Sequence, residues 1–179
     1  IPPIKKIAVL DVGCGSGILA LMLAQRGAFR VTAIDIEQGA VRQTSVNVQA
    51  SPWKERIMTI QADIRAWNST DKFDVIVCHP PFYNETILPP DTSRLLARNS
   101  VSLSMAELFD GLCGRLSSSG IFSLVIPCNR EKEVRALAIE HGLHPVNSLR
   151  IITVEGKVPK RILLAFSFDA VTSEQRCIL

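Results

Sequence analysis

The turn at residues 10–17 places an acidic side chain before three glycines at alternate positions, in the order Leu-Asp-Val-Gly-Cys-Gly-Ser-Gly. Glycine permits backbone torsions and a close approach that a Cβ would block. In an open α/β sheet, ligands bind beside a strand–helix turn of this kind. A dinucleotide pattern would need glycine where Ile18 stands, and a phosphate loop would need a lysine that is missing here. The turn therefore predicts a ligand site, against the alternative of a tight turn that binds nothing.

Two carboxylates follow later apolar runs in the same way. Asp35 ends the run 31–34, and Asp63 comes shortly after the run 57–60. A carboxylate at the position of Asp35 can accept hydrogen bonds from both hydroxyls of a ribose. Taken singly, each is better explained as a helix cap or a solvated turn. Because they would share one edge of the sheet with the glycine turn, the three features together predict a cofactor site.

A third element follows the run 73–78, in the order His79, Pro80, Pro81, Phe82. Two prolines fix φ and remove two N–H donors, which stiffens the backbone. The Pro80 carbonyl can then accept a hydrogen bond, and Phe82 is held as a flat platform. With the side chain of His79, these groups suit a planar substrate that carries an NH₂ group and needs to be aligned for reaction. The alternative is a structural turn that ends a buried strand.

Apolar runs alternate with helix-like segments along most of the chain. Residues 146–154 and 162–168 are β-rich, and the connection 155–161 is too short for a crossover helix, so this pair should be antiparallel. Residues 18–26 are apolar nearly all round and predict a buried helix. The pattern predicts an α/β, Rossmann-like fold with a mostly parallel seven-stranded sheet, an antiparallel C-terminal hairpin and helices on both faces. The expected parallel strands are residues 7–10, 31–34, 57–60, 73–78 and 121–126.

Two later helices carry capping signals. Ser104 and Glu107 have the spacing of a capping box, which predicts a helix that begins there and ends near residue 117. Asn129 can cap a helix over residues 130–141.

Composition excludes several classes of protein. The chain has 179 residues, 47 % hydrophobic and 21 % charged, which indicates one globular domain. No apolar stretch approaches the ~20 residues that a bilayer requires. Five cysteines without a C-x-x-C pair, and only three histidines, argue against a zinc site or a disulfide framework and fit a cytoplasmic protein. The net charge of +3 permits nucleic acid as a partner without arguing for it.

The form of the glycine turn resembles motif I of the class I S-adenosylmethionine-dependent methyltransferases, through Asp11, Gly13, Gly15 and Gly17. The resemblance implies that S-adenosylmethionine is the cofactor and S-adenosylhomocysteine its product. It also implies that the glycines pack against the methionine and ribose portions of the cofactor and that Asp11 lies near its ammonium group.

Two further segments take roles from the same resemblance. Asp63 would contact the adenine amino group of the cofactor, with Ile64 beside the ring. Residues 79–82 resemble motif IV of the amino-methyltransferases, Asn/Asp-Pro-Pro-Tyr/Phe, and would be catalytic. His79 departs from the usual Asn, and a neutral imidazole offers fewer hydrogen-bonding combinations than an amide.

Residues 9–168 are similar to the tRNA adenine-N6 methyltransferases that modify the adenine beside the anticodon of tRNA1(Val). This likeness implies an N-methyltransferase that acts on the exocyclic N6 amine of an adenine in tRNA. It also implies that residues 1–179 are a single methyltransferase domain whose N-terminal segment is missing. The stretches that carry the likeness include residues 10–17, 19–25, 51–53, 78–83, 157–161 and 163–166.

Basic residues give modest support for an RNA substrate. Between residues 150 and 161 there are four basic side chains and one acidic one, so this connection could hold phosphates. A solvated charged loop is the alternative. The candidate RNA contacts are Arg98, Lys157, Lys160 and Arg161.

Other functions remain open at this level. Guanine N2 in ribosomal RNA and a glutamine amide in a protein would each present a planar NH₂ group to the same turn. A cofactor-binding module without turnover is a third possibility. A dinucleotide oxidoreductase is disfavoured by Ile18. The sequence does not define the oligomeric state.

Overall fold

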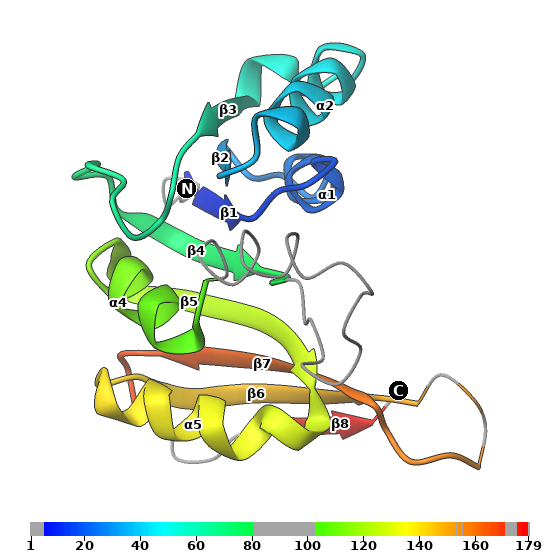
Figure 1. The fold of residues 1–179 in the computed structure, drawn as a ribbon, viewed down its shortest axis with the longest axis vertical. Helices are drawn as coiled ribbons and strands as arrows, with labels where there is room; N and C mark the ends of the chain where they lie inside the picture. The colour runs from blue at the N-terminus through cyan, green and yellow to red at the C-terminus, as the bar shows by residue number, and fades with distance from the viewer. Residues whose placement is uncertain (1–5, 81–102, 153, 155, 171–174, 179) are drawn as a thin grey trace, which may run out of the picture.

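The computed structural model describes residues 6–80, 103–152, 154, 156–170 and 175–178. These residues form one eight-stranded sheet with the strand order β3-β2-β1-β4-β5-β7-β6-β8 (Figure 1). Neighbours from β3 through β5 pair in parallel, β7 is antiparallel to β5 and β6, and β8 is parallel to β6. The strands are β1 (Ala8–Val12), β2 (Arg30–Asp35), β3 (Ile57–Gln61), β4 (Phe73–Cys78), β5 (Leu116–Pro127), β6 (His144–Ile151), β7 (Arg161–Ser167) and β8 (Gln175–Ile178).

The α/β prediction, with a parallel sheet and an antiparallel C-terminal pair, is confirmed, and β8 adds a further strand at the edge. Two short 3-10 helices, η1 (Lys54–Arg56) and η2 (Cys128–Arg130), join longer elements. The α-helices are α1 (Ile18–Gln25), α2 (Gln38–Gln49), α4 (Met105–Cys113) and α5 (Glu131–Glu140).

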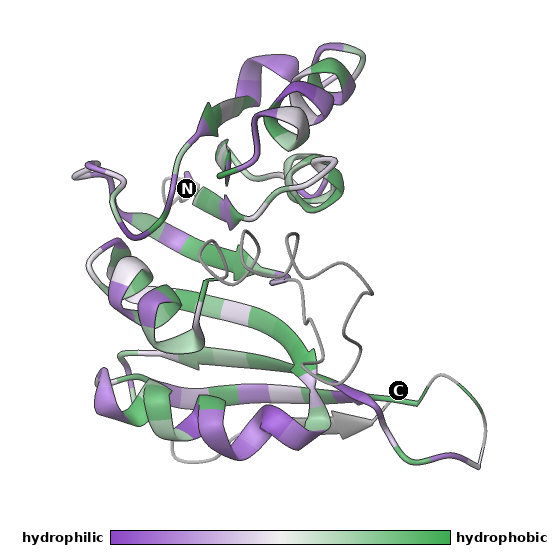
Figure 2. Ribbon diagram, viewed as in Figure 1, coloured by the Kyte–Doolittle hydropathy of each residue, from purple (hydrophilic) through white to green (hydrophobic). Residues whose placement is uncertain are grey.

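Helices pack on the two faces of the sheet and create two apolar cores, because successive side chains of a strand point to opposite faces. One core packs against α1 and α2 and includes Val9 and Val31. The larger core packs against α4 and α5 and includes Leu10, Phe109 and Phe122. Figure 2 shows the resulting pattern: apolar strands through the centre and polar stretches on the outer helices.

Three expectations about helices need correction. The helix α1 is not buried all round: Ala20 and Ala24 face the sheet, whereas Ile18 and Met22 are 59 % and 43 % exposed. The capping box at Ser104 is confirmed, but α4 ends at Cys113 and β5 begins at Leu116. Asn129 does not cap α5, whose N-cap residue is Arg130.

That third correction has a local cause. Residues 128–130 form the 3-10 turn η2, and α5 starts one residue later with Arg130 as its N-cap and no side-chain cap. Glu131 and Glu133 occupy the first turn of α5, where negative charge favours the positive end of the helix dipole.

The topology brings two distant parts of the chain to the same edge of the sheet. The carboxyl ends of the parallel strands β1 through β5 share one edge. Because β7 runs the opposite way, its first residues lie at that edge too: Arg161 pairs with Pro127, and the Cys128 N–H donates to the Lys160 carbonyl at 3.0 Å. The connection between β6 and β7 therefore leaves the sheet beside the ends of the parallel strands (Figure 1).

Candidate cofactor and substrate site

The glycine turn follows β1 and is shaped by left-handed backbone. Gly13, Gly15 and Gly17 have φ values of 73°, 57° and 81°, a region that side chains other than glycine rarely adopt. A Cβ on Gly17 would lie 2.7 Å from Cγ2 of Thr44, so α1 and α2 approach closely there. The backbone N–H groups of Gly13 and Cys14 both donate to the Ile34 carbonyl, which ties the turn to β2.

Asp35 holds the turn from the end of β2. Its Oδ2 accepts the Gly15 N–H at 2.9 Å, and its Oδ1 accepts the Glu37 N–H at 3.0 Å. The structure therefore brings together the turn and the strand-end carboxylate that the sequence singles out. The acidic group lies beside the turn, half-buried, and keeps acceptor capacity for a ligand hydroxyl.

Two residues of α2 that the sequence analysis missed also hold the turn. Thr44 Oγ1 donates to the Gly15 carbonyl at 2.9 Å, and Asn47 Nδ2 donates to the Ser16 carbonyl at 2.8 Å. Both are polar positions three apart, next to the buried Val48. That pattern is the signal that could have found them, because a buried or half-buried polar side chain on a helix needs a partner.

Asp11 is fully buried at the end of β1. Its Oδ2 accepts the Ala20 N–H at 3.1 Å, whereas its Oδ1 is buried with no hydrogen-bond partner among the described residues. Burial, reinforced by the charge of Asp35, raises the pKa of Asp11 to about 7. A buried acceptor without a donor beneath the turn fits a ligand that brings positive charge, such as an ammonium group.

Asp63 follows β3 and is held by its neighbour Arg65. Arg65 Nε and Nη2 donate to the carboxylate at 2.6–3.0 Å, and the Arg65 N–H donates to Oδ1 at 3.0 Å. These hydrogen bonds from Arg65 lower the pKa of Asp63. Ile64 between them is buried, and the Ala62 N–H donates to the Asp35 carbonyl, so the loop lies beside the end of β2.

His79 and Pro80 lie at the end of β4, next to the glycine turn. Cys78 pairs with Val12, so the register puts His79 level with the start of the turn. His79 is exposed and Pro80 is buried. The predicted residues Pro81, Phe82 and Arg98 lie outside the described part of the chain.

The remaining predicted RNA contacts are on the connection between β6 and β7. Lys157, Lys160 and Arg161 are all exposed, and they lie near the carboxyl ends of the parallel strands. The structure thus gathers the turn, Asp35, Asp63, His79 and this basic segment at one edge.

The described residues contain neither a cluster of metal-ligating side chains nor a membrane-spanning helix. Within them, three or more His, Cys, Asp or Glu side chains do not gather as metal ligands would. Their helices are also too short or too polar to cross a bilayer.

Several solved structures with this architecture are named as methyltransferases. The glycopeptide N-methyltransferase MtfA in complex with S-adenosylmethionine superimposes with a TM-score of 0.69 at 12 % identity, covering 93 % of this chain and 89 % of that one. The ribosomal protein L11 methylase of Lactobacillus delbrueckii subsp. bulgaricus gives a TM-score of 0.63 at 23 % identity, over 93 % and 72 %. Residues 9–102 match the family described as "Methyltransferase domain". The fold and the site thus define a Rossmann-like methyltransferase of class I.

Curated relatives narrow the class. The tRNA1(Val) (adenine(37)-N6)-methyltransferase of Bacteroides thetaiotaomicron is 39 % identical over 163 residues, which is 90 % of this chain and 69 % of that protein. The enzyme of the same name from Shewanella amazonensis is 40 % identical over 167 residues, 89 % and 70 %. The chain belongs to the family of tRNA1(Val) (adenine(37)-N6)-methyltransferases.

Proposed function

We propose that this protein transfers a methyl group to the exocyclic N6 amine of an adenine in tRNA. The observation that carries the proposal is the identity of 37–40 % to relatives with that named activity, over most of the chain. The site geometry supports it, because the glycine turn, two strand-end carboxylates and the His79-Pro80 turn share one edge. Residues 1–179 would act as one domain in the cytoplasm, which the single sheet and the free cysteines Cys14, Cys78, Cys113 and Cys128 favour.

Each part of the site would have its own role toward the cofactor. S-adenosylmethionine would supply the methyl group from its sulfonium. Asp35 would accept hydrogen bonds from the ribose hydroxyls while it holds Gly15. Oδ1 of Asp11, which has no hydrogen-bond partner within the described part of the chain, would face the ammonium group. Asp63 and Ile64 would bind the adenine, through the carboxylate and through apolar contact.

The substrate amine would be held at the end of β4. The adenine must leave its stack to reach the site, since its amine is otherwise inaccessible. His79 and the Pro80 carbonyl would accept hydrogen bonds from the NH₂ group, and Phe82 would stack on the ring. These contacts would direct the nitrogen lone pair at the methyl carbon, so that alignment supplies most of the catalysis. The amine proton would then leave the methylated nitrogen for water.

Replacing His79 with alanine tests the role of that turn. We expect methyl transfer to an unmodified tRNA1(Val) transcript to fall about tenfold, since one contact that aligns the amine is lost. Affinity for S-adenosylhomocysteine should not change, because His79 would touch only the substrate. The measurement is incorporation of labelled methyl groups into tRNA, beside calorimetry of cofactor binding.

A histidine at the other edge of the sheet supplies the control. His144 is exposed at the start of β6, so His144→Ala should behave as wild type. Labelled methyl groups that appear in total protein and not in tRNA would overturn the proposed substrate.

The basic segment between β6 and β7 provides a second prediction. Replacing Lys157, Lys160 and Arg161 with alanine should weaken tRNA binding about tenfold and reduce the slope of log affinity against log salt by about 2, because fewer counterions are released. Affinity for S-adenosylhomocysteine should stay unchanged. Binding measured over a range of salt concentrations gives the slope.

A matched triple substitution controls for net charge. Changing the exposed Lys54, Arg56 and Lys132 to alanine removes the same charge at other places on the molecule. If the slope of log affinity against log salt falls equally in both triple variants, the segment 157–161 is not a specific contact for tRNA.

A further inference from the structure

The carboxylate of Asp63 accepts several hydrogen bonds from the side chain of Arg65. Arg65 Nη2 lies 2.6 Å from Oδ2, and Nε lies 2.9 and 3.0 Å from Oδ2 and Oδ1. Two parallel N–H···O bonds of this kind fix the plane of a carboxylate as well as its position. The Asp63 and Arg65 side chains are 26 % and 30 % exposed, so the group is fixed and still reachable by a ligand.

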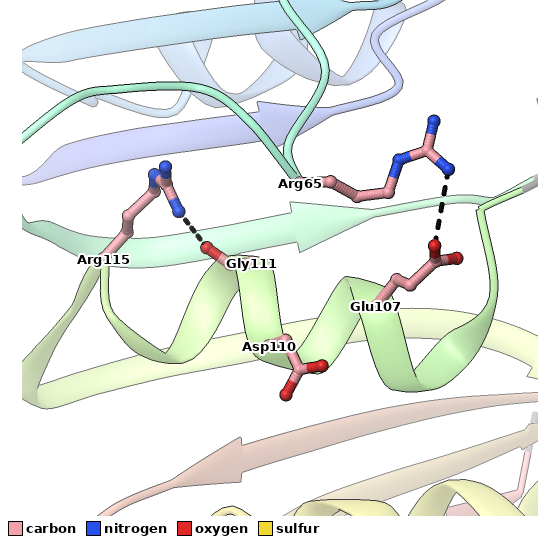
Figure 3. Close-up of a pocket in the computed structure, with 5 residues that line it drawn as sticks. All are labelled: Arg65, Glu107, Asp110, Gly111 and Arg115. Carbon is pink, nitrogen blue, oxygen red and sulfur yellow. Dashed lines mark hydrogen bonds and ion pairs between the residues drawn. The ribbon is translucent and has the colours of Figure 1, made fainter.

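The same guanidinium also reaches a helix on the other side of the loop. Arg65 Nη1 lies 3.4 Å from Oε1 of Glu107 on α4 (Figure 3). Glu107 is itself fixed, because its Oε2 accepts the backbone N–H and the hydroxyl of Ser104 in the capping box. The chain of contacts therefore runs from Asp63 through Arg65 to the first turn of α4.

Two more contacts keep the loop against α4. A Cβ on Gly111 would lie 2.9 Å from the carbonyl oxygen of Ile64, so the helix backbone comes very close to the loop there. One turn further on, Arg115 donates to the carbonyls of Gly111 and Trp67. Arg65, Glu107, Gly111 and Arg115 line one pocket beside the loop (Figure 3). The backbone of the loop is thus held independently, and Arg65 is the side chain that orients Asp63.

Hydrogen-bond capacity explains what this orientation can achieve. Oδ1 of Asp63 receives the Arg65 N–H and a share of Nε, and Oδ2 receives Nη2 and the other share. Since two N–H groups of one guanidinium share the facing lone pairs, the outer lone pair of Oδ2 stays available. A single acceptor direction, fixed in space, can distinguish a ring that carries an amine from one that does not.

We propose that Arg65 is a positioning residue that sets selectivity for the 6-amino group of the cofactor adenine, by holding Asp63 against α4 through Glu107. This inference rests on the proposed cofactor site. It adds that selectivity depends on a residue that does not touch the cofactor. Loss of Arg65 leaves the negative charge of Asp63 in place but lets the carboxylate rotate.

The test compares two ligands by calorimetry with the full-length protein: S-adenosylhomocysteine and its analogue in which purine replaces adenine. Wild type should prefer the amino ligand about tenfold, the value of one hydrogen bond to a charged group. In Arg65→Met, affinity for S-adenosylhomocysteine should fall about fivefold to tenfold, while affinity for the purine analogue stays unchanged. The preference should therefore nearly vanish. Arg65→Lys keeps the positive charge but cannot donate two parallel hydrogen bonds to the carboxylate. It should retain an intermediate preference for S-adenosylhomocysteine over the purine analogue.

Two control variants separate positioning from general damage. Arg26→Met changes an exposed arginine after α1 and should leave both affinities unchanged. Arg115→Lys disturbs the same loop without touching Asp63, and it should affect both ligands alike. Arg65 variants that lose affinity for both ligands equally, or that keep the wild-type preference, would overturn the inference alone. A wild type that binds neither ligand would overturn the proposed cofactor site, and the inference with it.

Discussion

Asp35→Ala should weaken binding of S-adenosylhomocysteine about tenfold to hundredfold, the value of one or two hydrogen bonds to a charged group. Two losses act together. The proposed contacts with the ribose hydroxyls disappear, and the Gly15 N–H loses the acceptor that now holds it at 2.9 Å. Isothermal calorimetry with the purified protein measures the change directly.

A neighbouring acid provides the comparison. Glu37 is exposed two residues later and caps α2 without a side-chain hydrogen bond, so Glu37→Ala should bind as wild type. An Asp35→Ala protein with unchanged affinity would show that the ribose lies elsewhere. If NAD binds and S-adenosylhomocysteine does not, the whole cofactor proposal is wrong.

The second large effect concerns Asp11 and the stability of the free protein. The pKa of Asp11 is raised to about 7 by burial. Between pH 4 and 7 the folded state therefore keeps a proton that the unfolded chain releases, so the free energy of unfolding falls as pH rises through this window. The difference between this pKa and that of an aspartate in the unfolded chain corresponds to about 4 kcal/mol of unfolding free energy at most.

Above pH 7 the buried carboxylate of Asp11 is charged and lowers the free energy of unfolding, and Asp11→Asn removes this loss of stability. The amide oxygen would keep the bond from the Ala20 N–H and leave a buried NH₂ group unpaired, which costs about 1–3 kcal/mol, so the net gain at pH 8 should be about 1–3 kcal/mol. At pH 5, where Asp11 is neutral, the gain should disappear. Urea unfolding of the two proteins at both pH values measures it. Affinity for S-adenosylhomocysteine should fall in the variant, because the charge that would face the ammonium is gone.

An exposed carboxyl serves as the control for Asp11. Asp169 lies beyond β7 at the other edge of the sheet, and Asp169→Asn should shift stability little at either pH. A difference between wild type and Asp11→Asn that is the same at pH 5 and pH 8 would contradict a buried carboxylate that ionises near neutrality.

The sheet could be predicted from sequence because its signals are local and repeated. Each parallel strand is a short apolar run, and the capping box at Ser104 is a spacing rule that the structure confirms. The residues at which helices and strands begin and end were harder to predict. The helix α4 stops at Cys113, and the serine-rich residues 117–119 belong to β5. They lie in the register shift between Leu116 and Ile121, which pair with Phe73 and Val75 of β4, so these two pairs hold the serines within the strand despite their weak strand propensity.

Burial depends on what covers a helix, which composition does not reveal. Residues 18–25 are apolar on every side, yet only the face with Ala20 and Ala24 meets the sheet. The position of a cap also depends on the neighbouring backbone. Asn129 lies inside the 3-10 turn that follows Pro127, so it is not the residue that precedes α5.

For the site, residue types at strand ends were enough to find Asp11, the glycines, Asp35 and Asp63, whose roles toward the cofactor stay predictions. The side chains that hold these groups are harder to assign, because a polar position on a helix indicates that a partner is needed but not which residue it is. Arg65 meets Glu107 across 42 positions of sequence, and Thr44 meets Gly15 across 29. Only the folded chain brings such partners together. Sequence patterns therefore identify the groups that would bind ligands more readily than the side chains that hold those groups in place.

The reversed direction of β7 fixes a length as well as a location. Counting along the sheet, β4 and β5 lie between β1 and β7. Three strand spacings of about 4.8 Å therefore set about 14 Å between the strand that leads into the glycine turn and the strand that begins at Arg161. This distance is set by the backbone hydrogen bonds that join neighbouring strands. If RNA binds at Arg161 as proposed, side-chain substitutions there would change its affinity, whereas strand order would keep the distance between that contact and the glycine turn.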